Sequence, residues 1–373
     1  MGVGEIIAHP HYHSGHGRGG ASVTMGGGAS TLRIRSAQAW LGPGKLLDDV
    51  TVVCDGGRIG WVGTSRLAPP ADRELEVDGF LMPAVADRHV HIGLADPGAV
   101  LLGGVTAVRD LAWPPDVIFG MADASEMPTF NGPLIRAAGP MLTGPGGYPT
   151  ADRWAPPGTG QEVRGADEAT KAVLTLADRG AAAIKVSLNA EAGPTPGDAE
   201  LASIVQTAHE RGLPVTAHVQ GKGQAERALG AGVDEFAHCP WTERLSDRVI
   251  EAAAKTMRIV STLDIWSYGK VTPELRMAAD NLARFRAAGG TVVYGTDLGN
   301  GPIPPGIDVR EALLLHETVG MTPDEVLEAM VVGPLQPGAP ADLIAVARNP
   351  LEGLDGLGDL KLVVRAGRVV TGA

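Results

Sequence analysis

Short apolar runs alternate with longer, amphipathic segments through the middle of the chain. The segments 199–212 and 271–289 have helical periodicity, and each closes with a glycine. The apolar runs are short and rich in Val, Ile and Ala, which predicts strands at 80–93, 104–110, 133–139, 181–187, 213–218, 232–238, 258–263 and 291–297. Eight strand–helix units in this order predict an α/β fold of the (β/α)8 TIM-barrel type.

The two ends of the chain have a different pattern. Strand-like runs separated by Gly- and Asp-containing turns lie at 31–37, 50–54 and 57–63, and similar runs return at 342–347 and 361–370. We therefore expect residues 31–79 and 341–373 to pair into a small β-sandwich domain beside a barrel at 80–340. Residues 1–30 are rich in Gly and His without periodicity, so we expect a flexible tail, with Met25 as a candidate start.

Composition narrows the classes of partner. The net charge of −12 over 373 residues argues against nucleic acid or an anionic membrane surface. Cys54 and Cys239 form no disulfide framework, and no apolar run reaches the ~18 residues of a membrane span or has the pattern of a signal peptide. We expect a cytoplasmic protein with no membrane contact and a small-molecule ligand; the oligomeric state stays open, a homo-oligomer included.

Two histidines one residue apart, His89 and His91, end the first predicted barrel strand. Because residues i and i+2 share one face of a strand, both imidazoles point to the same place, which favours a metal site over two solvated histidines. Chemistry in such a barrel sits at the C-terminal ends of the strands, and other predicted strands carry further candidates there. The predicted metal ligands are His89, His91, Lys185, His218, His238 and Asp297.

Lys185 and Asp297 are the candidate catalytic residues. Lys185 places an ammonium group in an apolar strand, where an isolated buried charge is costly. An ion pair with an unidentified partner would remove that cost, and so would reaction with CO₂ to an anionic carbamate that bridges two metals; we favour the carbamate. Asp297 could serve as an N-cap or a metal ligand, and a carboxylate at the centre can also hold the proton of a metal-bound water.

Several segments together resemble the amidohydrolase superfamily, in particular its imidazolonepropionase-like branch, over about residues 31 to 373. The segments are PAVADRHVHIG, GVTAVRDLAWPP, AAGPMLTGPGGYP, GAAAIKVSLNAEAG, LPVTAHVQG, AGVDEFAHCPW, YGTDLG and APADLIAVARNPLEG. The resemblance implies that the barrel is a metal-dependent hydrolase with two divalent ions, expected to be zinc with manganese as the alternative. One ion would be held by His89, His91 and Asp297, the other by His218 and His238, with Lys185 as the bridging carbamate.

The same resemblance implies a reaction. A hydroxide that bridges the metals would attack an amide or cyclic amide C–N bond, and Asp297 would carry its proton to the leaving group. Two alternatives stay open. A metallo-dipeptidase or carboxypeptidase-like activity of the Xaa-Pro or Xaa-Arg type would need a cation for the substrate carboxylate, with Arg153 as the candidate. A mononuclear deaminase would not need Lys185, so metal stoichiometry separates it.

The aromatic residues suggest the kind of substrate. They make up 4% of the chain, yet many follow predicted barrel strands, whose loops form the mouth of the site. Large rings there favour a substrate with an apolar or aromatic group beside its scissile carbonyl, although packing between loops is the alternative. Tyr148 also stands where relatives often carry a histidine. The predicted substrate-binding residues are Trp113, Tyr148, Arg153, Trp154, Gln220, Trp241, Trp266 and Tyr268.

Overall fold

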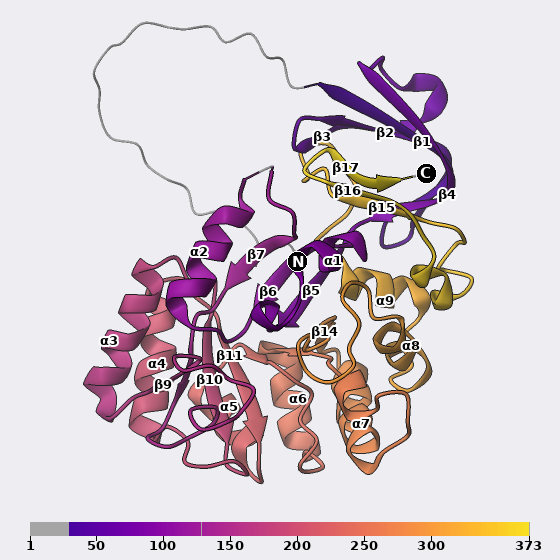
Figure 1. Ribbon diagram of the computed structural model, residues 1–373. Helices are drawn as coiled ribbons and strands as arrows, with labels where there is room; N and C mark the ends of the chain where they lie inside the picture. The colour runs from indigo at the N-terminus through magenta and orange to yellow at the C-terminus, as the bar shows by residue number, and fades with distance from the viewer. Residues whose placement is uncertain (1–29, 128, 373) are drawn as a thin grey trace, which may run out of the picture.

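A computed structural model describes residues 30–127 and 129–372, and it has two parts, a barrel and a sheet built from both chain ends (Figure 1). The prediction of a flexible tail therefore falls, apart from Ser30, outside the described residues. The predicted (β/α)8 barrel is confirmed. Its strands are β5 (Val85–Val90), β6 (Val105–Asp110), β7 (Leu134–Ala137), β10 (Ile184–Asn189), β11 (Val215–Gln220), β12 (Glu235–Phe236), β13 (Arg258–Val260) and β14 (Thr291–Val293).

The barrel strands run parallel and pair in sequence order. β5, β6 and β7 form one set and β10 to β14 another, and β8 (Met141–Thr143) joins them because it follows β7 after a short break and pairs with β10; β9 (Gly160–Glu162) lies beside β8. Backbone hydrogen bonds join the first strand and the residue after it to the segment after the last strand, and two of them lie next to the histidines. The Asp297 N–H donates to the His89 carbonyl (2.8 Å), and the His91 N–H donates to the Leu298 carbonyl (2.7 Å).

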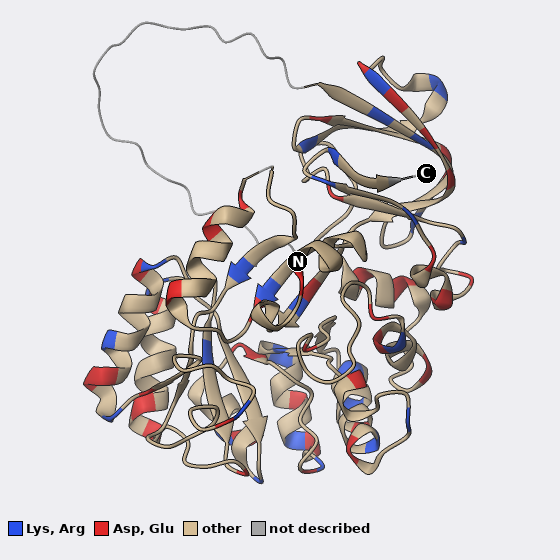
Figure 2. Ribbon diagram, viewed as in Figure 1, with Lys and Arg blue, Asp and Glu red and all other residues tan. Residues whose placement is uncertain are grey.

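Helices cover the outside of the barrel, and Figure 2 shows that charged residues are frequent along them. They are α1 (Pro97–Leu102), α2 (Pro115–Ser125), α3 (Gly165–Asp178), α4 (Asp198–Glu210), α5 (Gln224–Ala231), α6 (Asp247–Thr256), α7 (Pro273–Ala287), α8 (Val309–Glu317) and α9 (Pro323–Met330). The start of α7 follows its sequence signal, since the Thr272 hydroxyl accepts the Leu275 N–H at 3.0 Å and Pro273 takes the first turn. Its buried Leu282 and Phe285 each contribute ~1.5–3 kcal/mol by leaving water.

The two chain ends share one seven-stranded mixed sheet. Its order is β17-β16-β15-β4-β1-β2-β3, from β1 (Thr31–Gly42), β2 (Lys45–Asp55), β3 (Arg58–Thr64), β4 (Arg73–Pro83), β15 (Leu343–Val346), β16 (Leu360–Arg365) and β17 (Arg368–Gly372). The sheet curls over itself (Figure 1), so Val52 of β2 and Val364 of β16 share one apolar core.

The junction between sheet and barrel is short. β4 extends past the predicted boundary at residue 80, pairs with β15 up to Pro83, and passes through Ala84 into β5. The domain limits given above stay a prediction. No helix within the described ranges has the length and apolar character needed to cross a membrane.

Candidate metal centre

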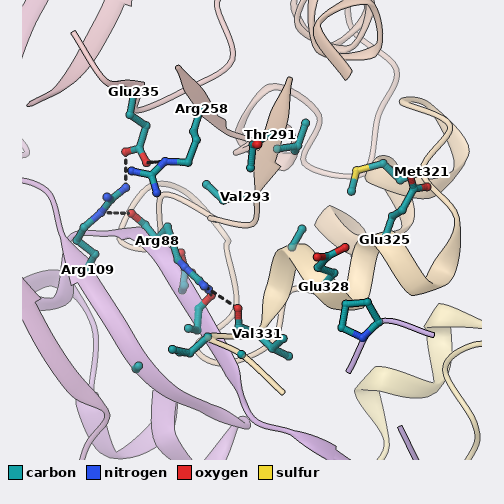
Figure 3. Close-up of a pocket in the computed structure, with 18 of the residues that line it drawn as sticks. Arg88, Arg109, Glu235, Arg258, Thr291, Val293, Met321, Glu325, Glu328 and Val331 are labelled. Atoms are coloured by element: carbon teal, nitrogen blue, oxygen red, sulfur yellow. Dashed lines mark hydrogen bonds and ion pairs between the residues drawn. The ribbon is translucent and has the colours of Figure 1, made fainter. Parts of the chain in front are cut away.

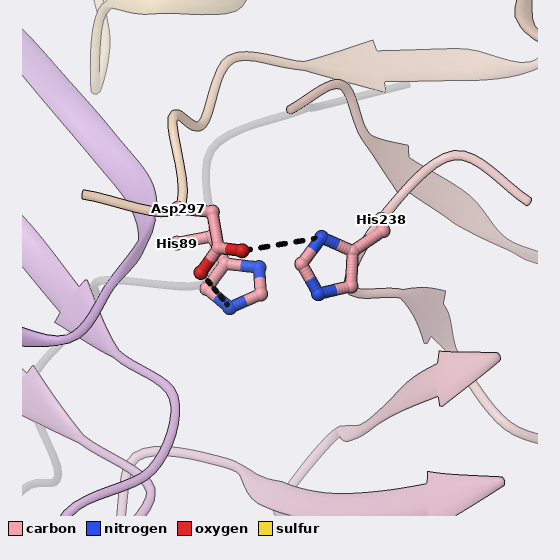
Figure 4. Close-up of side chains that lie close together, drawn as sticks. All are labelled: His89, His238 and Asp297. Carbon is pink, nitrogen blue, oxygen red and sulfur yellow. Dashed lines mark ion pairs between the residues drawn. The ribbon is translucent and has the colours of Figure 1, made fainter. Parts of the chain in front are cut away.

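Five of the predicted ligands meet at the C-terminal end of the barrel. The carboxylate of Asp297 lies among the imidazoles, with its Oδ1 atom 3.3 Å from Nε2 of His89 and 3.2 Å from Nε2 of His91. Its Oδ2 atom lies 3.9 Å from Nδ1 of His238 (Figure 4). The His218 ring lies next to that of His238, with centroids 4.8 Å apart. His89, His238 and Asp297 form a buried metal site whose ligand atoms all lie within 4.8 Å of one another.

His89 and His91 are held by contacts at Nδ1, so the Nε2 atom of each ring is left to face the cluster. Nδ1 of His89 lies 2.7 Å from the Ala237 carbonyl, and Nδ1 of His91 lies 3.1 Å from the Ala112 carbonyl. A carbonyl only accepts, so each Nδ1 carries the proton and each Nε2 keeps its lone pair. Partners of this kind commonly orient metal-ligating histidines.

The other two histidines have polar partners from neighbouring strands. The Thr262 hydroxyl lies 2.9 Å from Nδ1 of His238, and the side-chain amide of Asn189 lies 3.2 Å from Nε2 of His218. Thr262 follows β13 and Asn189 ends β10, so both contacts come from adjacent strands of the barrel. Each ring is therefore held by a polar side chain from a neighbouring strand or its end.

Burial favours the neutral form of three of the imidazoles, those of His89, His218 and His238. Loss of solvent lowers the pKa of His89 and His238 well below the usual value, and it lowers the pKa of His218 to about 3. The nearby positive charge of Lys185 acts on His89 and His218 in the same direction. A neutral imidazole is the form that binds metal ions.

Lys185 is the second residue of β10 and not its last. Its long side chain must therefore extend along the inside of the barrel to approach the cluster at the C-terminal end. It is fully buried, and Nζ has no hydrogen-bond partner and no carboxylate within ion-pair distance among the described residues. Burial lowers its pKa to about 7, although the carboxylate of Asp297 opposes this shift. The ion-pair alternative is thus left without a partner in the described part of the chain.

Asp297 is positioned by an unusual backbone. Its φ of 58° lies in the left-handed region, which is costly for a residue with a Cβ and is often found at functional sites. Gly295, two residues earlier, allows the close approach of this segment to β5, since a Cβ there would lie 2.3 Å from Val260 and 3.0 Å from the His89 nitrogen. The buried Asp87 carboxylate accepts the N–H groups of His89 and Thr296, which ties both sides together.

The donor set fits a metal ion. Nε2 of His89 and Oδ1 of Asp297 are both buried, and neither has a hydrogen-bond partner among the described residues. Unsatisfied buried polar atoms are rare and costly in folded proteins. Imidazole nitrogens and a carboxylate oxygen are ligands that zinc and related divalent ions prefer. A cation at this point would satisfy both atoms.

Two aromatic side chains cover the cluster. Tyr148 stacks on the His218 ring, with centroids 4.9 Å apart, and Trp154 lies over His91, with centroids 4.7 Å apart. Both belong to the segment between β8 and β9, where Gly147 is needed because a Cβ would lie 2.1 Å from the Pro194 carbonyl oxygen. These predicted substrate residues therefore lie directly against two predicted ligands.

The remaining predicted substrate residues are more dispersed. Trp113 is buried in the core against Gly93, whereas Trp241 and Trp266 pack against each other with centroids 4.8 Å apart. Arg153 is exposed in the same segment as Trp154. Gln220 ends β11 beside Asn189, and Tyr268 is 40% exposed.

Sequence reasoning missed the polar partners of the ligands. Asn189 could have been found, because it alternates with Lys185 and Ser187 along β10 and so shares their face. Asp110 gave a weaker signal as the last residue of β6; its carboxylate accepts the N–H groups of Ile92 and Ala112 and so fixes the turns beside His91. Thr262 follows its strand and gave no signal.

Comparison with known proteins agrees with this geometry. A family model described as the amidohydrolase family matches residues 98–370. An uncharacterised protein of Mycobacterium tuberculosis is 27% identical and the alignment covers 83% of this chain and 90% of the relative. Ochratoxinase of Aspergillus niger is 26% identical over 83% of this chain and 80% of its own. A 49-residue segment is 43% identical to imidazolonepropionase of an Arthrobacter species, 13% of this chain and 12% of that protein.

Solved structures show the same fold. The crystal structure of A. niger ochratoxinase has a TM-score of 0.79 at 22% identity and covers 92% of this chain and 96% of its own. A Xaa-Pro dipeptidase with bound methionine has a TM-score of 0.78 at 21% identity, covering 91% of this chain and 99% of its own. At these identities the likeness concerns the fold alone.

Proposed function

The chain belongs to the amidohydrolase family and is a metal-dependent hydrolase of a small molecule, and we propose that it cleaves an amide or cyclic amide C–N bond at a binuclear centre. The observation that carries the proposal is the environment of Lys185. Its amine is fully buried beside the ligand cluster, yet Nζ has no hydrogen-bond partner among the described residues. A buried amine without a hydrogen-bond partner is costly, so its presence beside the cluster needs a chemical explanation.

A carbamate supplies that reason. A neutral amine attacks CO₂, a new N–C bond forms, one proton is released, and the product is an anion with two oxygen ligands. With this group on Lys185, the donor set would contain His89, His91, His218, His238, Asp297 and the carbamate. Six donors exceed the four that one tetrahedral ion uses, so the set suits two ions, for which we propose zinc.

The roles of the chain's own residues follow from their contacts. When bound, divalent ions would polarise the scissile carbonyl and lower the pKa of a water molecule. Oδ1 of Asp297 faces the centre, so this carboxylate is placed to accept a proton and pass it to the leaving nitrogen. The backbone contacts of His89 and His91 fix their rings, and Tyr148 and Trp154 keep bulk water from the cluster.

The side chains that cover the site indicate the class of substrate. The ligand side chains are nearly inaccessible, with His218 the most exposed of the histidines at 5%, so a substrate must pass beside Tyr148 and Trp154. Flat rings favour a planar or bulky apolar group next to the scissile carbonyl. The likeness to ochratoxinase supports including ochratoxin among the compounds tested, and the likeness in fold to a Xaa-Pro dipeptidase supports including Xaa-Pro dipeptides.

The test is hydrolysis measured against a matched panel together with metal analysis of the same sample. The panel pairs N-acyl aromatic amides and cyclic amides with small polar analogues that contain the same bond, and adds ochratoxin, Xaa-Pro dipeptides and aminopurines. We expect C–N cleavage of the aromatic amides, two ions per chain, and a turnover at least ~10²-fold lower for Asp297→Asn. Turnover of the dipeptides alone would favour the dipeptidase alternative, and ammonia release from an aminopurine with one ion per chain would favour the deaminase.

A further inference from the structure

A hollow lies at the end of the barrel opposite to the histidine cluster. It has a volume of about 630 Å³, within the usual range of small-molecule sites. Its walls include Glu235, Arg258 and Thr291 at the starts of β12, β13 and β14, together with α9 and the segment 331–334 (Figure 3). We call this hollow the basal cavity.

Five arginines and four carboxylates line the basal cavity, and several of them form close ion pairs. Arg109 forms a buried ion pair with Glu235. Arg286 binds Glu325 of α9 through both carboxylate oxygens, each at 2.7 Å. In these two pairs, four of the charges that line the cavity balance one another. These four groups therefore contribute little net attraction for a charged ligand.

Two guanidinium groups have no close carboxylate partner of their own among the described residues. Arg88 donates to backbone carbonyls, including that of Val331 at 2.7 Å, and among the described residues no carboxylate oxygen lies within 4 Å of it. Arg258 reaches a carboxylate only at 3.9 Å, and that carboxylate is Glu235, which Arg109 already binds. Arg258 lines the cavity, and its side chain is 24% exposed.

Arg258 differs from the other arginines of the cavity wall. It combines a partly exposed side chain with no carboxylate closer than 3.9 Å, whereas Arg109, Arg136 and Arg286 each have a close carboxylate and Arg88 is bound to backbone carbonyls. Carboxylates also line the cavity, and Glu328 is one that has no ion pair among the described residues. An anion that pairs with Arg258 would give this guanidinium a close partner.

The rest of the wall determines what kind of anion would fit. Val292 and Val293 of β14, with Met321 and Val331, give the space an apolar side. Glu328 on α9 stands on the far side without an ion pair among the described residues, so it disfavours a second negative group there. A ligand with one anionic end and an apolar body matches both features.

We propose that the basal cavity binds a small organic monocarboxylate whose carboxylate pairs with Arg258 and whose apolar chain lies along β14. A guanidinium forms strong charge-assisted hydrogen bonds with a carboxylate, and Arg88 adds attraction without giving up its carbonyl contacts. This site is separate from the metal centre, so the proposal does not depend on which bond the enzyme cleaves.

The experiment is a ligand-observed NMR titration of the intact protein with hexanoate, hexanamide and inorganic phosphate. We expect hexanoate to bind with a Kd below about 1 mM. Arg258→Gln should weaken hexanoate binding about tenfold or more, because a charge-assisted hydrogen bond is lost. The matched control is Arg248→Gln, which removes an exposed arginine of α6 outside the cavity and should leave the Kd unchanged.

Arg258→Gln also separates this site from the metal centre, since a carboxylate bound at the histidine cluster would be unaffected. Val293→Phe, which fills part of the cavity, provides a second variant if Arg258→Gln does not fold, and it should also weaken binding. Equal binding of hexanoate to wild type and to folded variants would overturn the proposal. Hexanamide or phosphate binding as tightly as hexanoate would overturn the assignment to an apolar monocarboxylate, and so would the absence of hexanoate binding.

Discussion

Nε2 of His89 lies 3.3 Å from Oδ1 of Asp297, and neither atom has a hydrogen-bond partner among the described residues. Because Nδ1 of His89 faces a carbonyl and burial lowers the pKa of the ring far below its usual value, Nε2 presents a lone pair. Two electron-rich atoms at this distance repel each other unless a cation binds both. The contact is therefore the strongest local argument for a metal ligand pair.

Removal of metal by a chelator should abolish hydrolysis and lower the melting temperature. A ligand bound only by the folded state stabilises it by about 2.7 kcal/mol at a hundredfold excess over its Kd. Calorimetry and elemental analysis on the same samples check this, and zinc should restore both properties. Active enzyme with a single tightly held ion would contradict the binuclear centre.

Asp297→Asn should lower kcat by at least ~10²-fold, because general acid–base groups typically contribute that much. Asparagine keeps the shape of the side chain, so the melting temperature of the metal-free protein should change little. Steady-state kinetics on the best substrate of the panel give the comparison. A rate close to that of wild type would mean that another group moves the proton.

Lys185→Met should abolish activity while the fold is retained, because methionine has a similar shape but cannot form a carbamate. The matched control is Lys171→Met on the exposed surface of α3, which should be fully active. Growth with ¹³C-labelled bicarbonate should give wild type a carbamate NMR signal that the Lys185 variant lacks. An unmodified Lys185 in active wild-type enzyme would refute the carbamate.

Trp154→Ala should raise KM for an aromatic amide much more than for a small polar amide with the same bond, because its ring lies over His91. Trp61→Ala, in β3 of the small sheet, is the control and should affect neither substrate. Trp241→Ala provides a further comparison, since Trp241 packs against Trp266. If Trp154→Ala changes both KM values equally, the ring only packs the loop.

Glu311→Gln should reduce the dependence of stability on pH. Burial raises the pKa of Glu311 to about 8, so between its unfolded pKa near 4.5 and that value the folded state binds more protons than the unfolded state. The contribution of Glu311 to stability should therefore fall as pH rises from 5 to 8, so relative to wild type the glutamine variant should be spared a loss on the order of 1 kcal/mol or more. Asp308, whose pKa burial raises to about 7, leaves a smaller slope in the same direction.

Denaturant unfolding at pH 5 and pH 8 measures this difference for both proteins. Glutamine can still accept the Asp264 N–H, which Glu311 binds at 2.7 Å. The short 3-10 turn that begins at Asp264 should therefore be preserved. Equal loss of stability in the two proteins would show that Glu311 does not titrate in this range.

The sequence by itself determined the barrel fold and the strand face on which His89 and His91 lie. Alternation of short apolar runs with amphipathic segments reflects which faces are buried, and that pattern depends only on local periodicity. In the same way, the spacing of His89 and His91 was enough to place both imidazoles on one side of a strand. The pairing of the two chain ends followed from strand-like runs at both termini.

Only the tertiary structure decided which groups touch. That Lys185 Nζ has no partner among the described residues, that Asn189 contacts His218, and that Trp154 rather than Trp113 lies over a ligand histidine all depend on distances between segments far apart in the sequence. The basal cavity had no signal either, because Arg88 and Arg258 belong to different strands, and only the closed barrel shows that neither has a close carboxylate partner of its own among the described residues. Periodicity encodes the face on which a side chain lies, whereas its neighbours across the barrel are set by how the strands and loops pack.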